Sequence, residues 1–144
     1  MQINRTVDYG VRVMIHLAGM PVGTRSICPD LAAAADVPPS FMSKILRRLV
    51  NARLINSGRG IGGGFELARP ASQITLLDVV QAIEGPICLN ICLQSATMCN
   101  RSSWCAAHLV WADAQRKLEQ VLGAAVLDKL ATQSQTMRSS LHGR

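Results

Sequence analysis

Apolar residues recur at helical spacing along the first third of the chain and predict three helices there. In the first, over residues 4–18, the apolar face carries Val7, Val11, Met14, Ile15 and Ala18. A second, short helix is expected over residues 30–35, because Pro29 suits its first turn and an alanine run follows. Pro38 and Pro39 then end this helix and begin a third.

The third predicted helix has two faces of opposite character. Its apolar face, which is expected to be buried, carries Phe41, Ile45, Leu46 and Leu49. Its other face is small and cationic and carries Ser40, Ser43, Lys44 and Arg47. Two helices joined by a short proline-containing turn, the second with a basic polar face, indicate a helix-turn-helix whose second helix enters the major groove of DNA.

A glycine-rich hairpin is predicted directly after this helix. Short strands are expected over residues 53–57 and 65–68, on either side of the segment GRGIGGG, which places Arg59 and Gly60 near the tip. A loop that cradles the phosphates of a nucleotide is normally followed by a helix N-terminus, and here a strand follows. The hairpin therefore predicts a wing, with Arg59 and its glycine neighbours in the minor groove of DNA.

The second half of the chain is expected to be helical outside one loop. Thr75 caps a helix over residues 76–83, which ends at Gly85. After a cysteine-containing loop, a long helix repeats an apolar residue every seven positions, at Trp104, Trp111, Leu118 and Ala125. This stripe favours a homodimer seam, with packing on the chain's own first helix as the alternative. A short helix near 126–131 and a disordered tail over 132–144 are predicted beyond it.

These elements predict a mainly α-helical protein with a small β wing. A chain of 144 residues suits one domain with an added dimerisation element. The expected parts are a winged helix-turn-helix domain (1–84), a cysteine-rich cluster-binding loop (85–103), a dimerisation helix region (104–131) and the disordered tail (132–144).

The net charge of +6 changes this picture because it is unevenly placed. Between Lys44 and Arg59 the chain has five basic residues and no acidic one. Phosphate binding requires such a local patch, whereas a merely solvated face usually mixes both signs. No secretory signal or membrane-spanning run is recognisable, so we expect a cytoplasmic protein, in which thiols stay reduced.

Four of the five cysteines lie between residues 88 and 105, and His108 follows three residues later. Thiolate and imidazole donors gathered so closely predict an iron-sulfur or zinc site. Small buried cysteines and extracellular disulfides are the alternatives; the polar residues between these cysteines argue against both, since they predict an exposed loop. Cys28 lies far from the others and is expected to be a buried or cap-adjacent thiol rather than a ligand.

The motifs together resemble a known family nearly end to end. DYGVRVMIHLA is similar to its first helix, VPPSFMSKILRRLVNARLINSGRGIGGGFELARP to its recognition helix and wing, and TLLDVVQAIEGP to the helix before its cluster loop. The family is the IscR, NsrR and RirA type of bacterial winged-helix repressors, which bind DNA as dimers and hold an iron-sulfur cluster. The wing RG-x-GGG-F followed by three spaced cysteines is the specific combination.

The resemblance implies that Cys92, Cys99 and Cys105 bind the cluster. In one branch the fourth ligand is a histidine at the position of His108 and the cluster is 2Fe-2S. In another, an aspartate from the partner subunit's first helix, matching Asp8, completes a 4Fe-4S cluster. We predict the 2Fe-2S cluster with His108. The chain departs from the common pattern with six residues between its first two ligands instead of five, and with an additional Cys88 as a candidate ligand.

The predicted function is that of a homodimeric regulator of transcription whose affinity for its operator depends on a cluster that senses redox state, iron, cluster supply or nitric oxide. One alternative is a thiol switch in which Cys88 and Cys92, or another pair, form a disulfide. A second is a structural zinc ion on three cysteines and a histidine. A small electron-transfer protein is a third, against which the wing and basic helix argue. No catalytic constellation is recognisable, so we do not expect an enzyme.

Overall fold

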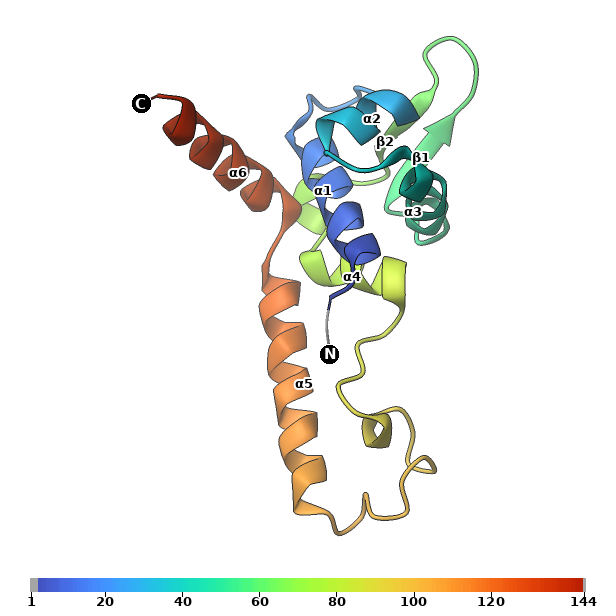
Figure 1. Ribbon diagram of the computed structural model, residues 1–144, viewed down its shortest axis with the longest axis vertical. Coiled ribbons are helices and arrows are strands. Elements are labelled where there is room, and N and C mark those ends of the chain that lie inside the picture. The colour runs from blue at the N-terminus through green and yellow to red at the C-terminus, as the bar shows by residue number, and fades with distance from the viewer. Residues whose placement is uncertain (1–2, 144) are drawn as a thin grey trace.

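The structure, a computed structural model, describes residues 3–143. Figure 1 shows the first four helices and the hairpin gathered in one body, from which the last two helices extend in different directions. The elements in chain order are α1 (Arg5–Gly19), α2 (Cys28–Ala34), α3 (Pro39–Asn51), β1 (Ile55–Gly58), β2 (Gly64–Leu67), the 3₁₀ turn η1 (Ala71–Gln73), α4 (Leu76–Glu84), the 3₁₀ turn η2 (Ile91–Leu93), α5 (Ala106–Ala124) and α6 (Leu127–His142). This mostly helical architecture with one small sheet confirms the predicted fold class.

The core of the winged domain forms where α1, α3 and α4 meet. The buried side chains of these helices are Val7, Val13, Met14, Leu17, Met42, Ile45, Leu46, Leu49, Val79, Val80 and Ile83. Phe41, predicted in the buried stripe, is only half-buried and packs edge-on against Tyr9, with ring centroids 5.0 Å apart. Met42 takes the fully buried position instead. The amphipathic pattern therefore predicted the buried face of α3 correctly except in its first turn, where Met42 and not Phe41 is fully buried.

The wing is an antiparallel hairpin in which Ile55 pairs with Leu67 and Gly58 with Gly64. Both strands differ slightly from the predicted ranges 53–57 and 65–68. Arg53 lies in the turn that follows α3, because its N–H donates to the carbonyl of Val50 and its φ of 58° reverses the chain. The first strand therefore begins two residues later than predicted.

Helix α4 is fixed at both ends, as its sequence predicts. Thr75 accepts a hydrogen bond from the N–H of Asp78 at 3.1 Å, and the Asp78 carboxylate accepts one from the N–H of Thr75 at 2.8 Å, which completes a capping box. At the other end, Gly85 has a φ of 86°, a value that favours glycine, and turns the chain into the cysteine-rich loop.

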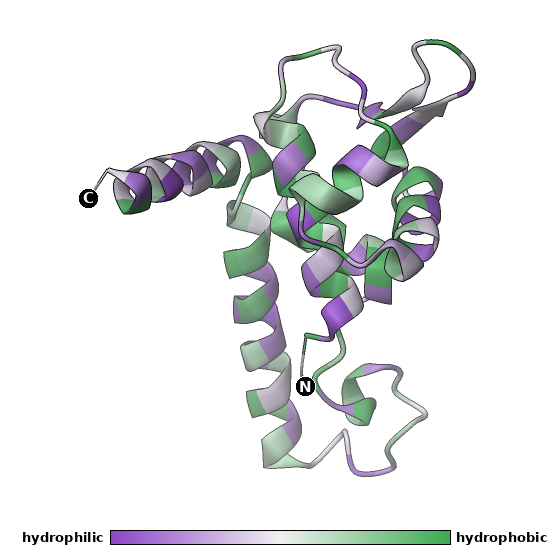
Figure 2. Cartoon of the chain, turned by 45° about the horizontal axis from the view of Figure 1, so that its top comes forward, coloured by the Kyte–Doolittle hydropathy of each residue, from purple (hydrophilic) through white to green (hydrophobic). Residues whose placement is uncertain are grey.

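Helix α5 begins at Ala106, so Trp104 lies in the preceding turn and does not belong to a helical stripe. Leu118 and Leu122 pack on the core of the winged domain, where α5 contacts α4 rather than the predicted alternative, α1. Figure 2 shows hydrophobic residues along the length of α5. Those that stay exposed on this helix are Leu109, Val110, Trp111 and Val121. The homodimer seam stays a prediction, now with a smaller set of residues to form it.

Disorder over residues 132–144 was the wrong prediction for the described part of the tail, because α6 continues to His142; Arg144 lies outside the described residues. This polar helix packs on α1 through its first turns, with Ala131 buried, and the side chain of Gln135 donates to the carbonyl of Gly19 at 3.5 Å. Its hydroxyl groups donate to the carbonyls four residues earlier, at 3.0 Å, from Thr132, Thr136, Ser139 and Ser140; these bonds satisfy the hydroxyls and do not stabilise the helix. Composition predicted a solvated segment and missed this tertiary support.

The junction between α5 and α6 is bonded to the segment that precedes α4. The N–H of Leu76 donates to the carbonyl of Ala125 at 2.8 Å, and the N–H of Leu127 donates to the carbonyl of Ile74 at 2.9 Å. These bonds explain why the predicted dimerisation region 104–131 is divided between two helices. Among the described residues, the structure contains no helix of the length and hydropathy that crossing a membrane requires.

Candidate functional site

The cysteine-rich loop runs from Gly85 to Cys105 and returns beside α5 (Figure 1). Its first residues are anchored, since Ile87 is buried and the N–H of Leu89 donates to the side-chain oxygen of Gln115 at 3.1 Å. Further along, short turns hold the loop, with the N–H of Leu93 bonded to the carbonyl of Asn90 at 2.9 Å. The loop therefore has a fixed entry from α4 and a fixed contact with α5.

Two of the predicted ligands lie together. Cys92, in η2, and His108, in the first turn of α5, line one pocket of about 330 Å³. The other residues that line it are Leu93, Ser95, Ala96, Ser102 and Ser103. The pocket is therefore lined by a thiol from the loop and by an imidazole from the helix that follows the loop.

The Nδ1 atom of His108 is buried and has no hydrogen-bond partner among the described residues. A buried polar atom without a partner costs about 1–3 kcal/mol, so such atoms are rare in folded proteins and call for an explanation such as a bound ion. His108 lines the pocket together with Cys92, while its Nδ1 atom itself lies out of contact with solvent. A thiolate and an imidazole nitrogen suit a soft metal centre.

The remaining predicted ligands do not converge on this pocket. Within residues 3–143, no three Cys, His, Asp or Glu side chains lie close enough together to hold a metal ion. Cys99 and Cys105 are half-buried free thiols, and Cys105 forms the N-cap of α5. Cys88 is exposed and its Sγ donates to the carbonyl of Asn90 at 3.0 Å. The donor types fit a cluster or zinc, and Cys99 and Cys105 have to move toward Cys92 and His108 to complete either.

Asp8, the alternative fourth ligand, forms an ion pair within its own chain. Its carboxylate pairs with the Arg12 guanidinium at 2.8 Å, one helical turn further along α1. Cys28, which was expected to be a buried or cap-adjacent thiol, is half-buried in the first turn of α2. It is distant in sequence from the cysteine-rich loop and lines a different pocket, between α1 and the α2–α3 turn.

The predicted DNA-facing residues are accessible. On α3, the side chains of Ser40, Ser43, Lys44 and Arg47 are all exposed. Arg59 and Gly60 are exposed at the tip of the wing, where Gly60 has a φ of 76°. Arg48 differs from the rest of the basic patch: it is half-buried and its Nη1 donates to the backbone carbonyl of Ile83 in α4. The patch that can meet DNA therefore excludes Arg48.

Sequence reasoning missed Arg25, which holds the wing against the body of the domain. Its Nε and Nη2 donate to the Glu66 carboxylate at 3.2 and 2.9 Å, and its guanidinium lies against Gly58. Beside it, Ser26 exchanges two backbone hydrogen bonds with Phe65, at 3.0 and 2.8 Å. These contacts join residues about forty positions apart, so no local motif could reveal them.

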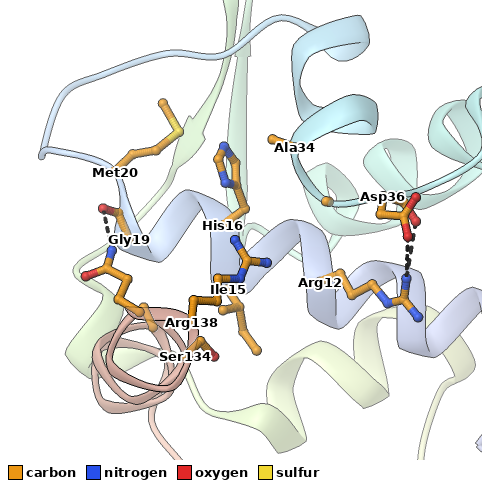
Figure 3. Close-up of a pocket in the computed structure, with 12 residues that line it drawn as sticks. Arg12, Ile15, His16, Gly19, Met20, Ala34, Asp36, Ser134 and Arg138 are labelled. Carbon is orange, nitrogen blue, oxygen red and sulfur yellow. Dashed lines mark hydrogen bonds and ion pairs between the residues drawn. The ribbon is translucent and has the colours of Figure 1, made fainter. Parts of the chain in front are cut away.

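A third pocket, of about 430 Å³, lies between α1 and α6. Figure 3 shows His16 and Arg138 beside it, with Arg12 bonded to Asp36. It was not predicted because its α6 side comes from the segment expected to be disordered. Elsewhere, on α5, a hydrogen bond from Lys117, 2.8 Å away, holds the pKa of Asp113 below its usual range. Neither feature contains a thiol.

Comparison with known proteins places the chain in a family. Residues 3–133 match the family model of Rrf2, described as an iron-dependent transcriptional regulator. The chain belongs to the Rrf2 family. A putative HTH-type transcriptional regulator of Mycobacterium tuberculosis is 44% identical to this Rrf2 protein over 87 residues, which are 60% of this chain and 54% of the relative. The chain thus matches about half the length of that relative.

Solved structures of two regulators share the fold. CymR, the global cysteine regulator of B. subtilis, is similar with a TM-score of 0.75 and 24% identity, over 92% of this chain and 97% of CymR. IscR of T. potens is similar with a TM-score of 0.71 and 23% identity, over 90% of this chain and 86% of IscR. At these identities the likeness shows the winged-helix fold of this Rrf2 protein and does not specify its cofactor.

Proposed function

We propose that this Rrf2-family regulator binds operator DNA as a homodimer and that an iron-sulfur cluster controls its affinity. The proposed cluster is 2Fe-2S, held by Cys92, Cys99, Cys105 and His108. The observation that carries the proposal is the orphaned Nδ1 of His108 beside the pocket that it shares with Cys92. The family's description as iron-dependent supports the same choice.

When bound, such a cluster supplies a centre that changes charge on oxidation and is lost when iron is scarce or nitric oxide is present. A histidine ligand in place of a thiolate raises its reduction potential, which suits a sensor. The chain contributes a loop that is fixed at Ile87 and Leu89 and held only by local turns further along. Cys99 can therefore move toward Cys92 with the loop, whereas a movement of Cys105, the N-cap of α5, also displaces the start of that helix, where His108 lies.

The DNA-binding part of the proposal rests on α3 and the wing. We assign major-groove contacts to Ser40, Ser43, Lys44 and Arg47, and minor-groove contacts to Arg59 and Gly60, all of which are exposed. A two-fold dimer would present two such surfaces to half-sites about 34–36 Å apart. The exposed apolar side chains of Val110, Trp111 and Val121 on α5 support a homodimer through that helix. A regulator of this kind acts in the cytoplasm.

A thiol switch is the second candidate. All five cysteines are free thiols, and Cys88 is the exposed one. A structural neighbour, CymR of Staphylococcus aureus, has a solved structure of its oxidized form, which supports oxidation chemistry in the same fold. Oxidation would join two thiols of the loop in a disulfide, with both electrons passing to an oxidant such as hydrogen peroxide. A zinc ion on the same ligands is a third candidate and would be redox-silent.

Anaerobic purification followed by an absorption spectrum and metal analysis separates these candidates. The proposal predicts visible absorption bands with two iron and two sulfide per chain after reconstitution. Four of each would replace the 2Fe-2S assignment by 4Fe-4S. A colourless protein that takes up neither iron nor sulfide would contradict the cluster; zinc in equal amount to the chain would then favour the structural metal, and its absence the thiol switch.

A further inference from the structure

Arg48 lies on the recognition helix but points away from the DNA-facing side. Its neighbour Arg47 is exposed, whereas Arg48 is half-buried and its Nη1 donates to the carbonyl of Ile83. This bond joins α3 to the last turn of α4, where the final carbonyls of a helix lack partners within the helix. A cation is favoured there because it also meets the negative end of the helix dipole.

Ile83 is held on its other side as well. Its side chain is 2% exposed and lies so close to Gly10 of α1 that a Cβ at Gly10 would be 3.0 Å from its Cγ1. The last turn of α4 is therefore wedged against α1 by packing and tied to α3 by a directional hydrogen bond. A displacement of Ile83 moves its carbonyl with respect to the Arg48 guanidinium.

The same turn leads directly into the cysteine-rich loop. Only Gly85 and Pro86 separate Glu84, the last residue of α4, from Ile87, which is again buried at 7% exposure. The connection is two residues long, and Pro86 has one of its two backbone dihedrals fixed by its ring. Cys92 follows Ile87 by five residues. A change in the loop thus reaches Ile83 through few rotatable bonds.

We propose that Arg48 is a positioning residue that couples the state of the cysteine-rich loop to the placement of the recognition helix. This inference rests on the proposed function and adds the route by which the loop acts on DNA binding. The other buried residues shared by α3 and α4 are apolar. Apolar contacts lack direction and tolerate sliding, whereas the bond from Arg48 fixes one helix relative to the other. Lys44 and Arg47 lie within about one turn of Arg48, so a shift transmitted there moves the DNA-contacting residues.

A purely structural role for Arg48 makes a different prediction. If the bond only caps α4, its loss weakens operator binding equally whether the loop is loaded or empty. If the bond couples the loop to α3, its loss reduces the ratio between the operator affinities of the two forms. The ratio therefore separates the two roles, and a general loss of stability does not change it.

The test measures operator affinity anaerobically for full-length wild type, Arg48→Met and Arg47→Met, each reconstituted with iron and sulfide and each stripped with a chelator. The probe is a duplex selected from random sequence by the wild-type protein. We expect at least a roughly fivefold affinity ratio in wild type, a ratio within about twofold in Arg48→Met, and an unchanged ratio in Arg47→Met, which loses a DNA contact in both forms. Amide hydrogen exchange of α3, measured without DNA, should respond to loading in wild type and not in Arg48→Met.

The outcomes distinguish the inference from the function on which it rests. A wild-type ratio that persists in Arg48→Met overturns the coupling role and leaves the sensor intact. A wild-type ratio of one overturns both. Arg48→Lys, which keeps a donor for the Ile83 carbonyl, serves if Arg48→Met does not fold, and should retain part of the ratio.

Discussion

Cys92 and His108 belong to separate elements, the turn η2 and helix α5, and yet line the same pocket, beside which the Nδ1 of His108 is buried without a partner. Such an atom is unfavourable in the metal-free fold. The buried Nδ1 atom therefore lowers the stability of the folded protein unless a metal or another ligand binds to it. This relationship makes His108 the most informative residue of the candidate site.

Replacement of His108 should affect the metal-free protein in an unusual direction. Because the imidazole nitrogen is buried and unpaired, His108→Leu should leave the free energy of unfolding unchanged or raise it by up to about 2 kcal/mol. Chemical denaturation of the stripped protein measures this change. A loss of more than about 1 kcal/mol would show that the nitrogen has a partner in the folded state, and would remove the main structural support for its role as a ligand.

The identity of the fourth ligand can be decided by a pair of variants. His108→Ala should abolish or strongly reduce cluster uptake, while Asp8→Asn should leave it unchanged, because Asp8 already pairs with Arg12 in its own chain. That exposed pair contributes only about 0–1 kcal/mol, so Asp8→Asn should also fold normally. Iron content and the visible spectrum after reconstitution report both effects. The reverse pattern would assign the site to the aspartate-ligated 4Fe-4S branch.

Arg59→Ala should weaken operator binding by about 1–3 kcal/mol if the wing reads a base edge or a narrow groove. Arg116→Ala is the matched control, since it removes the same charge from α5, where Arg116 pairs with Asp113. Fluorescence anisotropy on operator and random-sequence duplexes measures the effect. An equal loss on both duplexes would instead identify Arg59 as a phosphate contact.

Gly64 should tolerate substitution worse than Gly62, although both have positive φ values. The φ of Gly64 is 116°, and an added Cβ would lie 2.7 Å from the carbonyl oxygen of Ser26, whereas a Cβ on Gly62 would meet open space. We expect Gly64→Ala to lower stability by about 1–3 kcal/mol more than Gly62→Ala. Thermal unfolding of the two variants tests this difference, and equal melting temperatures would contradict the packing of the wing on residue 26.

The sequence predicted well the elements that local patterns determine. Pro39 at the start of α3, the Thr75 cap and the turn at Gly85 each follow from the conformational preference of one residue, and the structure has all three. Contacts between distant residues could not be predicted in this way. The inward turn of Arg48 toward Ile83 is invisible in a charge count, because the count assigns every arginine of the patch to the surface.

The candidate site was likewise predictable only in the part that depends on local sequence. The cysteine spacing predicted which residues carry the donors, and the structure brings Cys92 and His108 to one pocket. Sequence gave no indication that Nδ1 of His108 would be buried without a partner, since that depends on how the loop folds back on α5. The helical tail was missed for a similar reason: the hydrogen bond from the side chain of Gln135 to the carbonyl of Gly19, at 3.5 Å, joins residues far apart in the sequence and has no signature in a polar composition.

The most direct test of the proposed function is the operator affinity of the wild-type protein before and after removal of the cluster, measured anaerobically with Cys92→Ser as the control. The proposal predicts affinities that differ by at least about fivefold between the two wild-type forms, and no such difference in Cys92→Ser, which should not hold the cluster. Equal affinities for the two wild-type forms would contradict a cluster-controlled regulator and leave a DNA-binding protein whose loop serves another purpose.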